Sequence, residues 1–253
     1  MVEPRISGNP APEPVPGRLA FRRIRAEAAC RAGGRLRLAA TLPDPRPAAA
    51  LREVAERRWL ALISRATFES GQSIEVVARK WPDFEAAFEG FDPDAVAAFD
   101  GARLDALAAD EKLIRHAKKI RAVQRNARAL IRLRARGGLA LAVAEWPVRD
   151  ITGLWHRLAA EFRFLGVASA ALLLRRIGKD GFVPTPDLAD ALRYWSVVEI
   201  DGGDRPARPS QDILQALFNA WAADSGRPLC QVEAILLRSV APPGPEGCAC
   251  QCM

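Results

Sequence analysis

Residues 164–187 read FLGVASAALLLRRIGKDGFVPTPD, and this stretch decides the fold that we predict. Apolar residues recur at helical spacing over 168–177, and residues 155–162 before them are helical as well. Gly166 stands between the two segments and can adopt backbone angles that other residues avoid. The stretch therefore predicts a helix, a tight hairpin and a second helix.

An earlier stretch, residues 110–130, reads DEKLIRHAKKIRAVQRNARAL and predicts an amphipathic helix over about 114–136. One face is apolar, and the other carries Lys118, Arg121, Arg125, Arg128, Arg132 and Arg136. This basic face either follows a phosphate backbone or is simply solvated. Asn126 has similar alternatives, since it could contact DNA or bridge helices inside the protein.

Helical patterns run along nearly the whole chain, whereas the alternating pattern of strands is scarce. Further helices are predicted at residues 19–32, 48–68, 73–80, 100–108 and 188–195. Trp81-Pro82 is predicted to end one helix, and Asp92-Pro93 to cap the next. Helices joined by short turns imply an all-α fold.

The composition limits the kinds of protein that fit. With 253 residues and 49% hydrophobic content, the chain can form one large core or two smaller lobes. A net charge of +7 favours a polyanionic partner such as nucleic acid, although many proteins of similar charge bind none. No uncharged apolar run is long enough for a membrane span, and residues 1–17 lack the apolar core of a secretory signal. We therefore expect a cytoplasmic protein.

Three parts are predicted along the chain: a disordered tail at 1–18, a helical domain at 19–240 and a flexible Cys-rich tail at 241–253. Cys248, Cys250 and Cys252 stand close together in that last part, and five cysteines form no disulfide framework for a domain of this size. We expect reduced thiols, with soft-metal binding or prenylation as the alternatives. A monomer is also expected.

The acidic residue of greatest interest is Asp187. Thr185 is a natural N-cap and Pro186 suits the first helical position, so Asp187 should lie in the first helical turn. The helix dipole there favours an ionised carboxylate. Asp187 either takes part in chemistry or only supports the helix end.

The two quoted stretches resemble the DNA-3-methyladenine glycosylase I family, which belongs to the helix-hairpin-helix DNA glycosylase superfamily. The likeness covers residues 19–240 of a divergent chain and is strongest at WPDFEAAFEGF (81–91), at 114–129, and at GKDGF (178–182) with SGRPL (225–229). It implies an all-α fold of two helical lobes with a cleft between them. The implied partner is double-stranded DNA with a damaged base.

The resemblance also implies an activity: base excision repair by hydrolysis of the N-glycosidic bond of an alkylated purine such as 3-methyladenine. Asp187 would stabilise positive charge on the sugar in the transition state. Backbone amides of Gly166, Val167, Ala168 and Ser169 would hold a DNA phosphate, although related hairpins usually have a second glycine at the position of Ala168. Bifunctional relatives have Lys where this chain has Ala170, so a monofunctional enzyme without lyase activity is implied.

The base pocket is where the chain departs from the family pattern. The resemblance places Phe68, Glu69, Gln72 and Ile74 in this pocket. Ile74 replaces a stacking Trp, and Ala66 replaces a Glu that contacts the base. Glu69 could supply the missing carboxylate, or it could be an exposed helix residue. The departures leave two alternatives open: a non-catalytic DNA-binding or damage-recognition protein, and an enzyme for a different base.

A zinc site built from Cys and His is usual in the resembling family. The only histidines here are His116 and His156, both in predicted mid-chain helices and neither spaced with a Cys as a zinc pair would be. We therefore expect no metal and no other cofactor.

Overall fold

The structure, a computed structural model, describes residues 17–197 and 209–241. Its helices are α1 (Gly17–Arg31), α2 (Arg35–Ala40), α3 (Ala48–Arg52), α4 (Glu56–Glu69), α5 (Ile74–Ala87), α6 (Pro93–Ala97), α7 (Gly101–Ala109), α8 (Ala117–Arg134), α9 (Gly138–Glu145), α10 (Ile151–Glu161), α11 (Val167–Ile177), α12 (Pro186–Tyr194), α13 (Gln211–Ser225) and α14 (Leu229–Val240). Two short 3-10 helices lie at Glu89–Phe91 and Val148–Asp150. These described ranges contain no strand, which confirms the all-α prediction.

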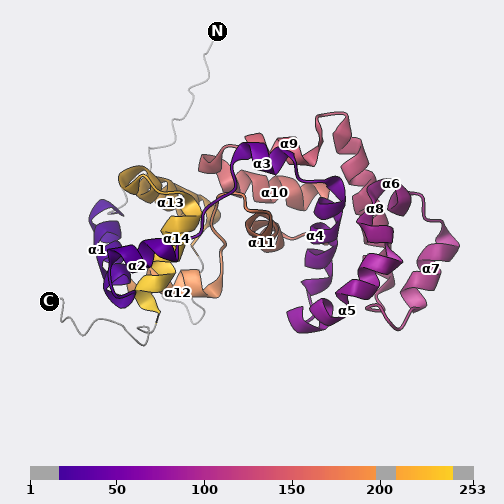
Figure 1. Ribbon diagram of the computed structural model, residues 1–253, viewed down its shortest axis with the longest axis horizontal. Helices are drawn as coiled ribbons and strands as arrows, with labels where there is room; N and C mark the ends of the chain where they lie inside the picture. The colour runs from indigo at the N-terminus through magenta and orange to yellow at the C-terminus, as the bar shows by residue number, and fades with distance from the viewer. Residues whose placement is uncertain (1–16, 198–208, 242–253) are drawn as a thin grey trace, which may run out of the picture.

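The helices form two lobes, as Figure 1 shows. In one lobe, α14 packs against α1, α12 and α13. In the other, α8 packs against α4, α6 and α7, with α5 beside α4. Helix α11 lies between the lobes and contacts both α4 and α10, so it is central to the molecule. The tails predicted at the two ends, with Cys248, Cys250 and Cys252, fall largely or wholly outside the described residues.

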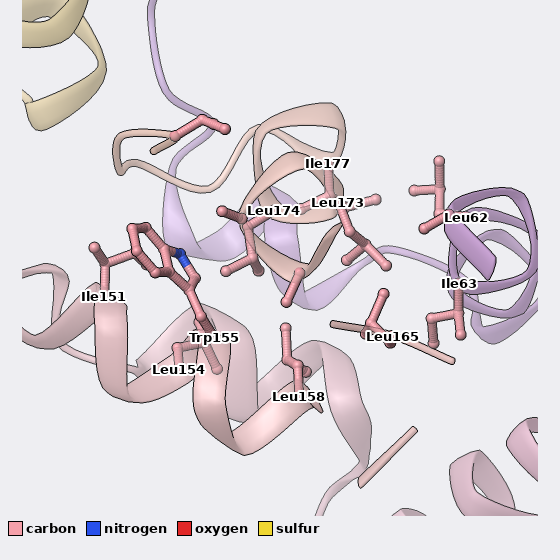
Figure 2. Close-up of a cluster of buried hydrophobic side chains, with 14 of the residues drawn as sticks. Leu62, Ile63, Ile151, Leu154, Trp155, Leu158, Leu165, Leu173, Leu174 and Ile177 are labelled. Carbon is pink, nitrogen blue, oxygen red and sulfur yellow. The ribbon is translucent and has the colours of Figure 1, made fainter. Parts of the chain in front are cut away.

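Side chains of α4, α10 and α11 converge in a buried apolar cluster, which Figure 2 shows around Trp155. Leu154 and Leu158 of α10 face Leu173 and Leu174 of α11, and all four are buried. Burial of apolar surface at roughly 25 cal/mol per Å² is the main stabilising term for such a cluster. It fixes α11 against α10 and α4.

Three helices that the sequence predicts begin at side-chain caps. Asp92 accepts hydrogen bonds from the amides of Asp94 and Ala95 at 3.0 and 3.1 Å, and Pro93 follows it at the first helical position. Asp100 caps α7 in the same way. Thr185 accepts from the amide of Leu188 at 3.2 Å and starts α12. Each oxygen satisfies an amide that a helix start leaves without a partner.

Two helix boundaries differ from the prediction. Residues 48–68 form α3 and α4, with a break at 53–55, and not one helix. Helix α5 continues through Pro82, which was expected to end it. Trp81 stacks on Phe84 and Phe91 at centroid distances of 5.7 and 5.2 Å, so aromatic packing on both sides of Pro82 offsets the hydrogen bond that proline cannot donate.

No helix within residues 17–197 and 209–241 combines the length and the apolar composition that crossing a lipid bilayer requires.

Candidate functional site at the turn between α10 and α11

The turn at residues 162–166 joins α10 to α11, so the predicted helix, tight turn and helix are confirmed. Gly166 does not use the unusual backbone angle expected of it, because its φ of −76° is open to any residue. The left-handed backbone angle belongs instead to Phe164, whose φ is 59°. An aromatic residue rarely adopts this angle. Gly166 is the N-cap of α11 and makes no side-chain cap.

Asn126 fixes the turn from the side of α8. Its Nδ2 donates to the carbonyl oxygen of Arg163 at 3.1 Å, and its Oδ1 accepts from the Arg163 amide at 2.7 Å. The Thr67 hydroxyl of α4 donates to the same carbonyl at 3.5 Å. The Asn126 side chain is nearly inaccessible, since the residue is 1% exposed. Of the two alternatives for Asn126, the bridge inside the protein is therefore correct.

The N-terminus of α11 is open. The first helical bond runs from the Ala170 amide to the Gly166 carbonyl at 2.8 Å, and within the described part of the chain the amides of Val167, Ala168 and Ser169 have no acceptor. A Cβ built on Gly166 would meet no atom within 4 Å. Free amides and the positive end of the helix dipole together attract anions.

A Gly166→Ala substitution tests this description of the turn. Because φ is −76° and no atom lies near, the free energy of unfolding should fall by less than about 1 kcal/mol. The matched control is Gly226→Ala, where φ is 64° with equally open surroundings, and a loss of about 1–2 kcal/mol is expected. Denaturant unfolding measures both. An equal or larger loss at Gly166 would show that its backbone is strained.

Asp187 lies in the first turn of α12, as predicted, and its side chain is exposed. It forms no hydrogen bond or ion pair with any residue that the structure describes. The N-terminus of α12 therefore holds an unpaired negative charge that the helix dipole favours.

Two other carboxylates next to α11 are neutralised by cations. Glu69 accepts from Arg65 at 2.9 Å and from Arg176 of α11 at 2.6 Å. Glu233 of α14 is 1% exposed and pairs with Arg175 of α11. Of the two alternatives for Glu69, the exposed helix residue is therefore wrong, and the carboxylate that could serve the base pocket is already paired with two arginines. Both side chains tie α11 to its neighbours.

The remaining residues of the predicted base pocket are divided between core and surface. Phe68 is fully buried, with its ring centroid 4.5 Å from that of Phe84, so it presents no surface to a base. Gln72 is exposed, and Ile74 is 54% exposed. The structure therefore does not group Phe68 with Gln72 and Ile74 on one surface.

Half of the basic face of α8 is engaged in structural contacts. Arg121 pairs with Asp105, Arg132 with Glu161 at 3.5 Å, and Arg128 donates to the carbonyl oxygen of Ala97 at 3.0 Å. The other three cations have no partner in the described ranges: Lys118 and Arg125 on α8, and Arg136, which lies in the turn just after it. Only these three remain free to contact a phosphate backbone.

Two further features complete the surroundings of α11. A cavity with a volume of about 160 Å³ lies where α11, α12 and α13 meet, bordered by Ala168, Thr185 and Gln211. No motif in the sequence marks Gln211.

Among the described residues, no cluster of three His, Cys, Asp or Glu side chains could hold a metal ion. His116 caps α8, its Nδ1 accepting from the Lys119 amide at 3.3 Å.

Part of the chain matches the model of a known protein family. Residues 51–160 match the family model of the methyladenine glycosylases. This part of the chain is similar to that family. The resemblance noted in the sequence is thereby confirmed over α3 to α10. None of the curated proteins matches the chain.

Solved structures similar to the chain are methyladenine glycosylases too. A crystal structure of a 3-methyladenine DNA glycosylase I shares 24% identity over 50% of this chain and 80% of its own, with a TM-score of 0.44. The Staphylococcus aureus enzyme shares 18% over 74% of this chain and 99% of its own, with a TM-score of 0.43. Identity and TM-score are both low, so these structures identify neither a substrate nor a site residue here.

Asn126 lies in the matched segment and forms two hydrogen bonds with Arg163 in the α10–α11 turn. The family match contains Asn126, Thr67 and Glu69, but it ends at residue 160, before the turn itself. The roles of Gly166, Val167, Ala168, Ser169 and Asp187 are therefore proposals, supported by the contacts that attach the turn to the matched segment.

Proposed function

We propose that this chain is a DNA glycosylase, which hydrolyses the N-glycosidic bond of a damaged base in duplex DNA. The observation that carries the proposal is the match of residues 51–160 to the methyladenine glycosylase family. By analogy with that family, the substrate is an alkylated purine such as 3-methyladenine. The net charge of +7 agrees with a polyanionic partner.

The duplex would lie across α11, with one phosphate on the amides of Val167, Ala168 and Ser169. This contact needs no side chain and fixes the register of the protein on DNA without reading sequence. The two hydrogen bonds from Asn126 to Arg163 hold the turn in place before DNA arrives. Binding then requires little ordering of the protein, which favours affinity.

Asp187 would act on the sugar. As the bond between C1′ and the base nitrogen breaks, the bonding electrons leave with the base, and positive charge develops on the sugar ring. An unpaired carboxylate close to C1′ stabilises that charge. Glu69 and Glu233 are less suitable, because their charges are already balanced by arginines. A water molecule then attacks C1′ and leaves an abasic site.

Cleavage of the DNA strand is not part of the proposed reaction. A lyase step needs an amine that forms a Schiff base with the sugar. Ala170, at the position of that lysine in bifunctional relatives, is fully buried and offers no nucleophile. The products are therefore a free base and an intact strand with an abasic site.

A second candidate is a damage-recognition protein that binds DNA without breaking a bond. The observation in its favour is the state of the predicted base pocket, where Phe68 is buried and Glu69 is paired with two arginines. Such a protein would keep the phosphate contact but would lack base release.

One experiment separates the two candidates. Fluorescence anisotropy of alkylated duplex DNA measures binding over a range of salt concentrations, and hot alkali reveals abasic sites in the same samples. A glycosylase gives both signals, whereas a recognition protein gives binding alone.

The salt series also tests two of the free cations. Replacing either Arg125 or Lys118 by Gln should reduce the slope of log K, the DNA-binding constant, against log salt concentration by about one. Arg121→Gln, which removes a cation already paired with Asp105, is the control and should leave that slope nearly unchanged.

A further inference from the structure

Helices α1 and α2 carry a concentration of positive charge that the proposed base chemistry does not use. Residues 17–40 contain seven arginines and one carboxylate, Glu27, which pairs with Arg31 at 2.6 Å. The whole chain has a net charge of +7, so this short region accounts for most of the excess. In Figure 1, α1 lies at the end of its lobe that is farther from α11. The region also lies outside residues 51–160, so the family match does not explain its charge.

A groove between α1, α2 and the start of α14 is lined by arginines from all three places. It has a volume of about 220 Å³. Its arginines are Arg22 and Arg25 of α1, Arg35 of α2, and Arg227, which stands just before α14. The rest of the described lining consists of alanine and leucine, without an acidic or an aromatic residue. We call this feature the arginine groove.

The charges of the arginine groove are not balanced by the protein. Arg22, Arg25 and Arg35 are exposed and form no hydrogen bond or ion pair within the described ranges. Arg227 donates to the neutral side chain of Gln231 at 2.8 Å and so keeps its charge. Like charges in one groove repel each other, and a groove lined by charge of one sign concentrates the electric field. The arginine groove therefore attracts anions.

The turn between α1 and α2 places Arg35 beside α1. Gly33 and Gly34 have φ of 77° and 128°, angles that glycine adopts more readily than other residues. The Gly34 amide donates to the carbonyl oxygen of Ala29 at 2.8 Å, and Leu38 anchors α2 as a buried residue. The backbone of the groove is thus formed before a ligand arrives, which lowers the ordering cost of binding.

The lining of the arginine groove fits phosphate groups. A guanidinium group binds two phosphate oxygens at once through parallel N–H donors. Aromatic rings and amide side chains, which would recognise a base, do not occur among the described residues that line the groove. Several guanidinium groups from three separate elements can neutralise successive phosphates of a nucleic-acid backbone, and such contacts read no sequence.

We infer that the arginine groove is a second DNA-binding surface, which holds the phosphate backbone of undamaged duplex away from the α10–α11 turn. The inference rests on the proposed function for the identity of the nucleic acid as DNA. It adds a contact that does not depend on the damaged base. Loss of the groove should therefore weaken binding to damaged and undamaged duplex by the same factor.

The salt dependence of binding to undamaged duplex, measured by fluorescence anisotropy, tests the groove. Each of Arg22→Gln, Arg25→Gln and Arg35→Gln should reduce the slope of log K against log salt concentration by about one, and the triple variant by about three. Arg23→Gln is the matched control, since Arg23 is an exposed arginine of α1 that does not line the groove. It should leave the slope nearly unchanged. An equal reduction with Arg23→Gln, or no reduction in the triple variant, would overturn the inference.

Two further results separate charge from folding and from geometry. The Tm of the triple variant should not fall, because the three arginines are exposed and glutamine has a similar helix propensity. Arg35→Lys keeps the charge but loses the paired N–H donors, so the slope should be kept while affinity falls severalfold. A slope reduced as much by Arg35→Lys as by Arg35→Gln would show that the contact is not electrostatic and would overturn the inference.

Side-chain NMR identifies the source of the phosphate. The full chain, labelled with ¹⁵N, is titrated with undamaged duplex, with inorganic phosphate at equal ionic strength, or with vesicles of phosphatidylglycerol. The Nε signals of Arg22, Arg25 and Arg35 should shift with the duplex. Shifts with inorganic phosphate or with the vesicles but not with the duplex would assign the groove to a free anion or to a lipid surface, and would overturn the inference.

The outcome for the arginine groove is separable from the outcome for the enzyme. Weaker DNA binding by the triple variant, in a chain that releases no base from any DNA, would support the groove and contradict the proposed function. Base release by the triple variant with unchanged DNA affinity and an unchanged salt slope would overturn the groove and leave the glycosylase proposal intact.

Discussion

Asp187→Asn is expected to slow base release by about 100- to 1,000-fold, the size of effect seen when one preorganised electrostatic contact to a transition state is removed. Asparagine keeps the size and the first-turn position of Asp187 but carries no charge to offset the positive sugar. The helix loses only the favourable dipole contact, about 0.3–1 kcal/mol. Single-turnover kinetics on alkylated duplex DNA measures the rate, and anisotropy should show unchanged DNA affinity.

Asp190→Asn is the matched control for this result. Asp190 lies on the same helix, is largely exposed and pairs with Arg193 at 2.5 Å, so its charge is already balanced. Its replacement should leave the rate within about twofold, because exposed ion pairs of this kind contribute little. If the Asp187 variant kept the full rate, or if both variants lost it equally, Asp187 would have no special role.

Asn126→Ala is expected to lower the free energy of unfolding by about 2–3 kcal/mol, because both hydrogen bonds to Arg163 are lost at a buried position. The turn, which is proposed to carry the phosphate contact, also loses these two bonds to α8. DNA affinity should therefore fall even at temperatures where the variant is fully folded. Denaturant unfolding and anisotropy on the same samples measure the two effects.

Asn219→Ala provides the comparison for Asn126. Asn219 makes polar contacts at a partly exposed place, donating to the Arg149 carbonyl at 2.9 Å, far from the α10–α11 turn in sequence. A loss of about 0.5–1.5 kcal/mol is expected there, with unchanged DNA affinity. A loss at Asn126 no larger than at Asn219 would mean that the two bonds do not hold the turn.

Local rules of the sequence predicted the helix starts correctly. Asp92, Asp100 and Thr185 each cap the helix that was expected to follow, because an N-cap bond joins residues only two or three positions apart. The position of Asp187 in the first turn of α12 follows from the same rule. Where Asp187 lies relative to α11 does not follow from it, since that depends on how distant helices pack.

The errors arose where tertiary packing outweighs local preference. Pro82 was expected to end a helix, yet the stacking of Trp81 on Phe84 and Phe91 continues α5 through it. The pairing of Glu69 with Arg176 joins residues 107 positions apart, so nothing near Glu69 in sequence indicates it.

The turn between α10 and α11 was predicted in its overall form but not in its backbone. An unusual backbone angle was expected at Gly166, because glycine tolerates such angles. In the structure the positive φ belongs to Phe164. Sequence pattern also gave no indication of Gln211, because the cavity exists only when α11, α12 and α13 meet. Contacts between distant elements decide such sites.

The most direct test of the proposed glycosylase is identification by mass of every base that the purified chain releases from alkylated duplex DNA. We predict release of a methylated purine together with an equal amount of abasic sites in otherwise intact strands. Tight binding to the same DNA without release of any base would contradict the enzyme and would favour a damage-recognition protein.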